Sequence, residues 1–252
     1  MDLPPLHDEL TFLAPLGEER AELLTTWLAG GLRHGGTALD VGCGWGELLL
    51  RVAAAAPAAT AVGVDQDGQA LAEARRRAAD RHLEGRASFV QGDGATAGPD
   101  AVEALVCLGA SHVWQVADDQ PLPYAAALQG LRQRAARSAR VVYGDGIWSR
   151  LPTPAAVAPL LGREDEFVSL RELTDLATDA GFAVVGVHEA SQEEWDTFES
   201  GFNAGPAYWL AEHGPDHPDA DAVRERARAQ RHAYLDGYRG ILGFAYLQLL
   251  AV

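Results

Sequence analysis

Three glycines at alternate positions, Gly42, Gly44 and Gly46, follow a short apolar run that ends in Asp40. Glycine has no Cβ and readily takes a positive φ, so the backbone of such a turn can approach a ligand closely. A helix with apolar periodicity begins after Gly46, and the free N–H groups of its first turn would point at the same place. The stretch therefore predicts a nucleotide-binding strand, turn and helix, with the carboxylate of Asp40 beside the ligand.

The spacing of the glycines separates two classes of ligand. A dinucleotide fingerprint has the order G-x-G-x-x-G, and Glu47 stands where its third glycine would be. Counted from Asp40, the stretch is D-x-G-x-G-x-G, which resembles the first motif of the class I S-adenosylmethionine-dependent methyltransferases. The resemblance implies that Asp40 binds the amino group of the cofactor's methionine part. A carboxylate there also favours the cationic sulfonium, whereas it would repel a pyrophosphate.

Two further acids follow at the ends of predicted strands. Asp65 ends the apolar run 60–65, about 20 residues after Gly46, where a carboxylate can accept both ribose hydroxyls. Asp93 lies in a Gly-Asp turn after the third predicted strand and resembles the family's adenine-contacting site. Each acid alone could be an ordinary helix cap or turn residue. The cofactor-binding residues that the resemblance implies are Asp40, Gly42, Cys43, Gly44, Trp45, Gly46, Asp65, Gln66, Asp93, Gly94 and Leu108.

Candidates for the chemistry follow the fourth and fifth predicted strands, at 101–108 and 140–144. Ligands of open α/β sheets bind outside the carboxyl ends of the strands, so His112 should face the reacting methyl group. A neutral imidazole could take the proton of an attacking hydroxyl or amine. Asp145 is the second catalytic candidate. The structural alternatives are a histidine that bonds only backbone and a simple Asp-Gly turn.

The elements that would position these residues form one α/β domain over 1–252. We expect an N-terminal arm and a helix in 1–35, followed by a Rossmann-like core in 36–191 and 240–252. The resemblance implies a doubly wound, seven-stranded sheet whose last strand enters antiparallel between the fifth and sixth. Residues 192–239 would then form a helical lid between the last two strands.

Large amphipathic side chains are concentrated in that lid, where they would line a pocket or pack a helical hairpin. The candidate substrate-binding residues, including one that follows the fifth strand, are Trp148, Glu194, Trp195, Asn203, Tyr208, Trp209 and Arg239. An aromatic-lined pocket would suit a planar, apolar or cationic acceptor.

Composition excludes several other functions. All 20 basic residues are arginine and the net charge is −16, so nucleic acid would be repelled. Neither of the two cysteines has partners at metal-ligand spacing, and Gly214, Pro215 and Pro218 interrupt the helix that a zinc site at His213 and His217 would need. No signal peptide or run of about 20 apolar residues is present. These features predict a cytoplasmic protein that binds no metal, nucleic acid or membrane.

The sequence thus predicts an enzyme that transfers a methyl group from S-adenosylmethionine to an oxygen or nitrogen of a small-molecule acceptor. In-line displacement at the sulfonium needs mainly alignment and exclusion of water. Two alternatives stay open: a nucleotide-dependent oxidoreductase of Rossmann type, and a protein that binds S-adenosylmethionine without transferring its methyl group. The sequence carries no signal for the oligomeric state.

Overall fold

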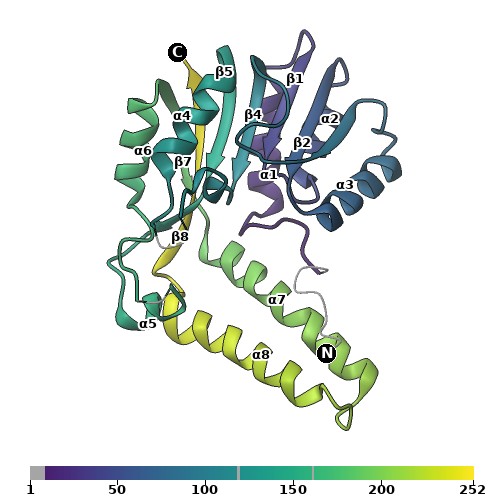
Figure 1. The fold of residues 1–252 in the computed structure, drawn as a ribbon, viewed down its shortest axis with the longest axis vertical. Helices are drawn as coiled ribbons and strands as arrows, with labels where there is room; N and C mark the ends of the chain where they lie inside the picture. The colour runs from purple at the N-terminus through teal and green to yellow at the C-terminus, as the bar shows by residue number, and fades with distance from the viewer. Residues whose placement is uncertain (1–8, 118–119, 161) are drawn as a thin grey trace.

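The computed structural model describes residues 9–117, 120–160 and 162–252, so residues 1–8 of the predicted arm lie outside the described residues. Its centre is an eight-stranded sheet in the order β3-β2-β1-β4-β5-β8-β6, with β7 also paired to β8 (Figure 1). The strands are β1 Gly36–Val41, β2 Ala59–Asp65, β3 Ala87–Gln91, β4 Val102–Leu108, β5 Ala135–Gly144, β6 Gly146–Trp148, β7 Phe182–Glu189 and β8 Leu242–Ala251.

Strand β8 pairs antiparallel with β5 on one side and with β7 on the other, whereas β1 to β5 pair in parallel. The predicted doubly wound sheet with an antiparallel last strand is therefore confirmed. The predicted number of seven strands is wrong, because the three residues of β6 form an additional antiparallel pair with the start of β8. They follow β5 after a single residue, and so short a segment has no strand periodicity of its own.

Helices cover both faces of the sheet. The helical elements are α1 Glu18–Ala29, α2 Glu47–Ala55, α3 Gly68–Asp80, η1 Ser111–Trp114, α4 Tyr124–Arg134, α5 Pro154–Val157, η2 Ala158–Leu160, α6 Leu170–Asp179, α7 Gln192–His213, α8 Ala220–His232 and the π-helix η3 Ala233–Tyr238. Successive residues of a strand point to opposite faces. In β4, Val106 packs with α1 and α2, whereas its neighbour Leu105 packs with α4 and α6.

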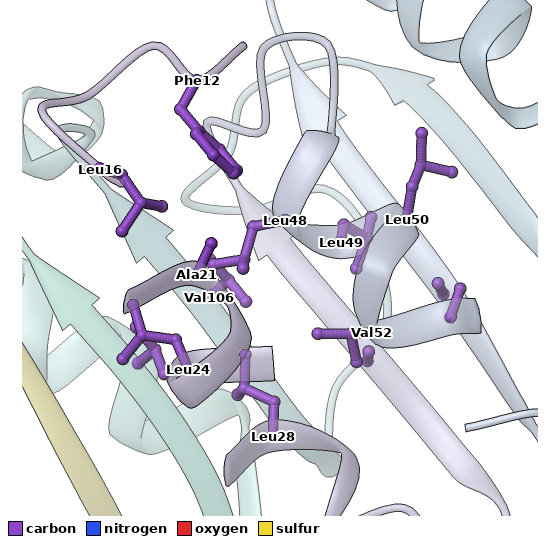
Figure 2. Close-up of a cluster of buried hydrophobic side chains, with 14 of the residues drawn as sticks. Phe12, Leu16, Ala21, Leu24, Leu28, Leu48, Leu49, Leu50, Val52 and Val106 are labelled. Atoms are coloured by element: carbon purple, nitrogen blue, oxygen red, sulfur yellow. The ribbon is translucent and has the colours of Figure 1, made fainter. Parts of the chain in front are cut away.

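Residues 9–17, here called the arm, pack over the face of the sheet that α1 and α2 cover. Figure 2 shows Phe12 and Leu16 of the arm turned toward side chains of α1, α2 and β4, among them Leu48 and Val106. Two backbone carbonyls also tie the arm down. The indole N–H of Trp45 donates to Thr11 (2.8 Å), and the hydroxyl of Tyr246 donates to Pro15 (2.9 Å). The arm is thus fixed above the glycine turn.

In the chain, helices α7 and α8 come between β7 and β8. The two helices lie side by side and extend away from the sheet (Figure 1). Helix α7 starts three residues after the carboxyl end of β7, with a capping box in which Ser191 and Glu194 bond each other's backbone N–H groups. In the described part of the chain, none of the helices is both long and apolar enough to cross a bilayer.

Candidate active site

The glycine turn joins β1 to α2 in a left-handed conformation. The φ angles of Gly42, Gly44 and Gly46 are 68°, 51° and 67°, a region that side chains rarely adopt. A Cβ on Gly44 would lie 2.6 Å from Leu13 of the arm, and one on Gly46 would lie 2.7 Å from the ring of Phe89. The turn therefore needs glycine both for its conformation and for its close neighbours.

Asp65, at the carboxyl end of β2, holds this turn in place. One of its carboxylate oxygens accepts the N–H of Gly44 (2.7 Å) and the other accepts the N–H of Asp67 (2.9 Å). A carboxylate has about four acceptor positions, so two remain for other donors. Asp65 can therefore hold the turn and still accept hydrogen bonds from a ribose.

Asp40 ends up buried, with 5% of its surface exposed, beside the same turn. Burial, and next the negative charge of Asp65, raises the pKa of Asp40 well above its usual range. Within the described residues, no group donates a hydrogen bond to its carboxylate. A cationic ligand placed here would stabilise the charged form, because an opposite charge offsets the cost of burial.

A small cavity of about 60 Å³ opens at the turn. It is lined by Phe12, Leu13, Ala14, Leu16, Asp40, Gly42, Cys43, Trp45, Glu47, Leu48, Val106 and Leu108. The structure therefore brings five of the predicted cofactor-binding residues together at one cavity. About two molecules of liquid water would occupy this volume. The cavity is small because side chains of the arm occupy the space above the turn.

Further predicted cofactor residues lie beyond this cavity, at the carboxyl ends of neighbouring strands. Asp65 pairs with Gln91, so the ends of β2 and β3 lie side by side. Asp93 is exposed and accepts the N–H of Ala95 (2.9 Å). Gly94 is buried, and its carbonyl accepts a hydrogen bond from Arg134 (2.9 Å). The carbonyl of Gln66 accepts one from the amide of Gln91 (3.0 Å).

Glu47, which stands where a dinucleotide fingerprint has glycine, has a role that the sequence reasoning missed. Its side chain is 4% exposed and pairs with Arg51 (2.9 Å), Arg77 (3.2 Å) and Arg81 (2.8 Å). Burial opposes its ionisation, yet the hydrogen bonds of Arg51 and Arg81 lower its pKa below the usual value. Only the Arg51 pair, four residues away on one helix, was visible in the sequence.

Asp145 and His112 occupy neighbouring loops at the carboxyl edge of the sheet. Asp145 is buried, and its two oxygens accept the N–H groups of Ser111 (3.0 Å) and Gly146 (2.8 Å). Burial raises the pKa of Asp145. The hydrogen bonds from Ser111 and Gly146 lower it, but by less. His112 is exposed on η1, next to Ser111. Neither residue is among the described residues that line the small cavity at the turn or the larger cavity described next.

A larger cavity of about 680 Å³ lies between the arm and the first turns of α1 and α7. It is lined by Glu9, Leu10, Thr11, Phe12, Ala14, Leu16, Gly17, Glu18, Glu19, Arg20, Leu23, His188, Ser191, Glu193, Glu194, Thr197 and Phe198. Phe12, Ala14 and Leu16 line both cavities. The arm is thus the wall between the larger cavity and the glycine turn.

The structure disperses the predicted substrate-binding residues. Of the seven, Glu194 is the one found among the described residues that line the two cavities, and it also accepts hydrogen bonds from Gly17 (3.0 Å) and Arg20 (2.9 Å). Trp195 is buried at the base of α7 against the rings of Phe198 and Tyr238, and its indole N–H has no partner among the described residues.

The remaining members of that set make other contacts. Trp148 packs edge-on against Phe167, and Arg239 pairs with Asp196 (2.8 Å). The amide nitrogen of Asn203 donates to the backbone carbonyl of Glu199 (2.9 Å). Further along α7, Tyr208 is exposed and Trp209 stacks on His213 at 4.3 Å. These contacts lie partly within α7 and partly between elements, and the residues do not converge on either of the two cavities.

Comparison with known proteins supports the methyltransferase fold. A family model described as a methyltransferase domain matches residues 38–133. The uncharacterized protein YjhP of Escherichia coli (strain K12) is 27% identical over 258 residues, which cover 100% of both chains. Its X-ray structure has a TM-score of 0.79 at 26% identity and covers 96% of this chain and 95% of YjhP.

Two solved structures of methyltransferases match over 100% of both chains. They are S-adenosylmethionine-dependent methyltransferases from Geobacter sulfurreducens (24% identity) and Thiobacillus denitrificans (25% identity), each with a TM-score of 0.81 and each in complex with S-adenosylhomocysteine. The methyltransferase domain at residues 38–133 and the sheet identify the chain as an S-adenosylmethionine-dependent methyltransferase with the class I fold.

Proposed function

We propose that this enzyme transfers the methyl group of S-adenosylmethionine to an oxygen or nitrogen of a small-molecule acceptor. The observation that carries the proposal is the left-handed glycine turn between two acids, buried Asp40 and Asp65, at the ends of neighbouring strands. The complexes of the Geobacter and Thiobacillus proteins with S-adenosylhomocysteine support the same cofactor here.

The residues present fit this cofactor. The buried carboxylate of Asp40 suits the cationic amine and sulfonium, and the free acceptor positions of Asp65 suit the ribose hydroxyls. Asp93 is exposed beyond the next strand end and would accept a hydrogen bond from the adenine amine. Cys43, Trp45 and Leu108 border the glycine turn and would contact the cofactor's apolar parts.

When bound, S-adenosylmethionine would supply an activated methyl group, and its sulfur would keep the electron pair of the broken bond. The chain's own contribution is alignment of the acceptor and exclusion of water. His112 would take the proton that an attacking hydroxyl or amine releases. Asp145, bonded to the backbone of Ser111, would act as a positioning residue for the loop that carries His112.

The acceptor class and the cellular location belong to this proposal as well. A net charge of −16 opposes binding of nucleic acid, and the larger cavity has the volume of a small-molecule site. The two free cysteines, Cys43 and Cys107, support a reducing compartment such as the cytoplasm.

Labelled methyl donor tests the transfer itself. The full chain is incubated with methyl-labelled S-adenosylmethionine and an extract of small metabolites, and we expect label in a product of low molecular mass. A chain that binds the donor but labels no product would instead be a binding protein. Incorporation of label only into added RNA, DNA or protein would contradict a small-molecule acceptor.

A further inference from the structure

The larger cavity is a half-open cleft whose bordering segments are bonded to one another. The arm is attached to α7 at two places: the N–H of Gly17 donates to Glu194 (3.0 Å), and Leu10 lies against Gly201, where the missing Cβ leaves room for it. The first turn of α1 closes a third side. At about 680 Å³ the cavity falls within the usual range of small-ligand sites, about 300–1,000 Å³.

Apolar and acidic side chains share the lining of this cavity. Its apolar part comes from Leu10, Phe12, Leu16, Leu23 and Phe198. Five glutamates also line it, and two of them are paired with arginines. Glu194 pairs with Arg20, the one arginine among the lining residues, and Glu18 pairs with Arg51.

The other three carboxylates of the lining, Glu9, Glu19 and Glu193, have no ion-pair partner within the described ranges of the chain. Among the described residues of the lining, His188 is the remaining ionisable group, and its ring nitrogen is bonded to Gln248 (3.4 Å). Unpaired charges of one sign in a concave, partly apolar site attract a ligand of the opposite sign and exclude an anion.

We propose that this cavity binds the methyl acceptor, and that the acceptor carries a cationic amine beside an apolar body. The inference rests on the proposed function. The cation is the group recognised by Glu9, Glu19 and Glu193 rather than the group that is methylated, because an ammonium held by carboxylates has no free electron pair. Phe12, Ala14 and Leu16 separate the cavity from the glycine turn, so a separate oxygen or nitrogen would reach past them once the arm shifts, toward the carboxyl edge of the sheet where His112 lies.

Three phenols that differ only in charge test the preference. Tyramine is a cation, 4-ethylphenol is neutral and 4-hydroxyphenylacetate is an anion, on nearly the same body. In titrations of the full chain at low salt, with and without S-adenosylhomocysteine, we expect tyramine to bind at least tenfold more tightly than the anion. The preference should shrink as salt is added. Tyramine that binds no better than 4-hydroxyphenylacetate would overturn the inference.

Matched glutamine variants locate the effect. Glu19→Gln and Glu193→Gln should each weaken tyramine binding about two- to fivefold, as expected for charge pairs at exposed side chains, and leave 4-ethylphenol unchanged. Glu22→Gln is the control, because Glu22 is exposed on α1, outside the residues that line the cavity. An equal loss in Glu22→Gln would mean that only the total charge matters, which contradicts the proposed site.

The same titrations separate this inference from the function on which it rests. If S-adenosylhomocysteine binds and the three phenols show no charge order, the transferase proposal stands and the cationic acceptor is wrong. If S-adenosylhomocysteine does not bind, the proposed function fails, whatever the order of the phenols.

Discussion

Asp65 links the two parts of the candidate cofactor site, because its carboxylate accepts the N–H groups of both Gly44 and Asp67. Removing it should therefore affect both stability and binding. We expect Asp65→Ala to weaken S-adenosylhomocysteine binding by about 1.5–3 kcal/mol and to lower stability by about 1 kcal/mol. Asp65→Asn, which keeps one acceptor oxygen, should lose less of each. Calorimetric titration and thermal unfolding measure both, and unchanged affinity in Asp65→Ala would contradict the ribose assignment.

Substitution of Asp40 should raise the stability of the ligand-free protein, whereas substitution of Asp65 should lower it. The pKa of this carboxyl is raised in the folded state, so the folded chain holds its proton to higher pH than the unfolded chain does. Stability therefore falls as the pH rises from the unfolded pKa toward the folded one. Asp40→Asn should unfold at a higher temperature than the wild type at neutral pH, with the difference vanishing in acid, and should bind S-adenosylmethionine more weakly. Lower stability at neutral pH would contradict the assignment.

His112 and Asp145 are distinguished by what each substitution leaves intact. His112→Ala should lower kcat by about 10²- to 10⁴-fold, the usual contribution of a general base, with little change in S-adenosylhomocysteine affinity or in melting temperature. Asp145→Ala should in addition lower stability, because it leaves the buried N–H groups of Ser111 and Gly146 without their acceptor. Full turnover in His112→Ala, once an acceptor is known, would remove histidine from the mechanism.

Among the elements, the arm decides access to the glycine turn. Leu13 lies over Gly44, and the cavity beneath has only about 60 Å³, so a bound nucleoside requires the arm to shift. We expect S-adenosylhomocysteine to change the hydrogen exchange of residues 9–17. Trp45→Phe removes the hydrogen bond to Thr11 and should raise arm exchange in the ligand-free protein. Identical exchange of the arm with and without the ligand would show that the cofactor binds elsewhere.

Helix α7 contains two tryptophans that the sequence placed together in one pocket and the structure separates. Trp195 is buried at the base of the helix, so Trp195→Ala should cost about 3–5 kcal/mol of stability. Trp209 packs on His213 and His217 near the other end of α7, so Trp209→Ala should leave the KM for the acceptor unchanged. Thermal unfolding and steady-state kinetics check both. A higher KM in Trp209→Ala would place the acceptor along the whole helix.

For the whole molecule, much of the fold could be predicted because its signals are local. The glycine turn after Asp40, the acid at the end of β2 and the regular alternation of strands and helices carried the resemblance that implied the doubly wound sheet with its antiparallel last strand.

The contacts that shape the cavities could not be predicted, since they join residues far apart in the chain. The pairs of Glu47 with Arg77 and Arg81 connect two helices, and the contact of Gly17 with Glu194 joins the arm to α7. Aromatic composition alone does not tell a pocket from a structural contact: Trp209, which the sequence places in the substrate site, packs against His213 and His217, and its role toward the substrate stays a prediction.

The central claim is that the turn between Asp40 and Asp65 binds S-adenosylmethionine rather than a dinucleotide. Calorimetric titration of the full chain with S-adenosylhomocysteine, and in parallel with NAD, measures it directly. The arrangement of the two acids and the glycines predicts that S-adenosylhomocysteine binds one molecule per chain and that NAD does not bind. Binding of NAD without binding of S-adenosylhomocysteine would contradict the account and favour an oxidoreductase.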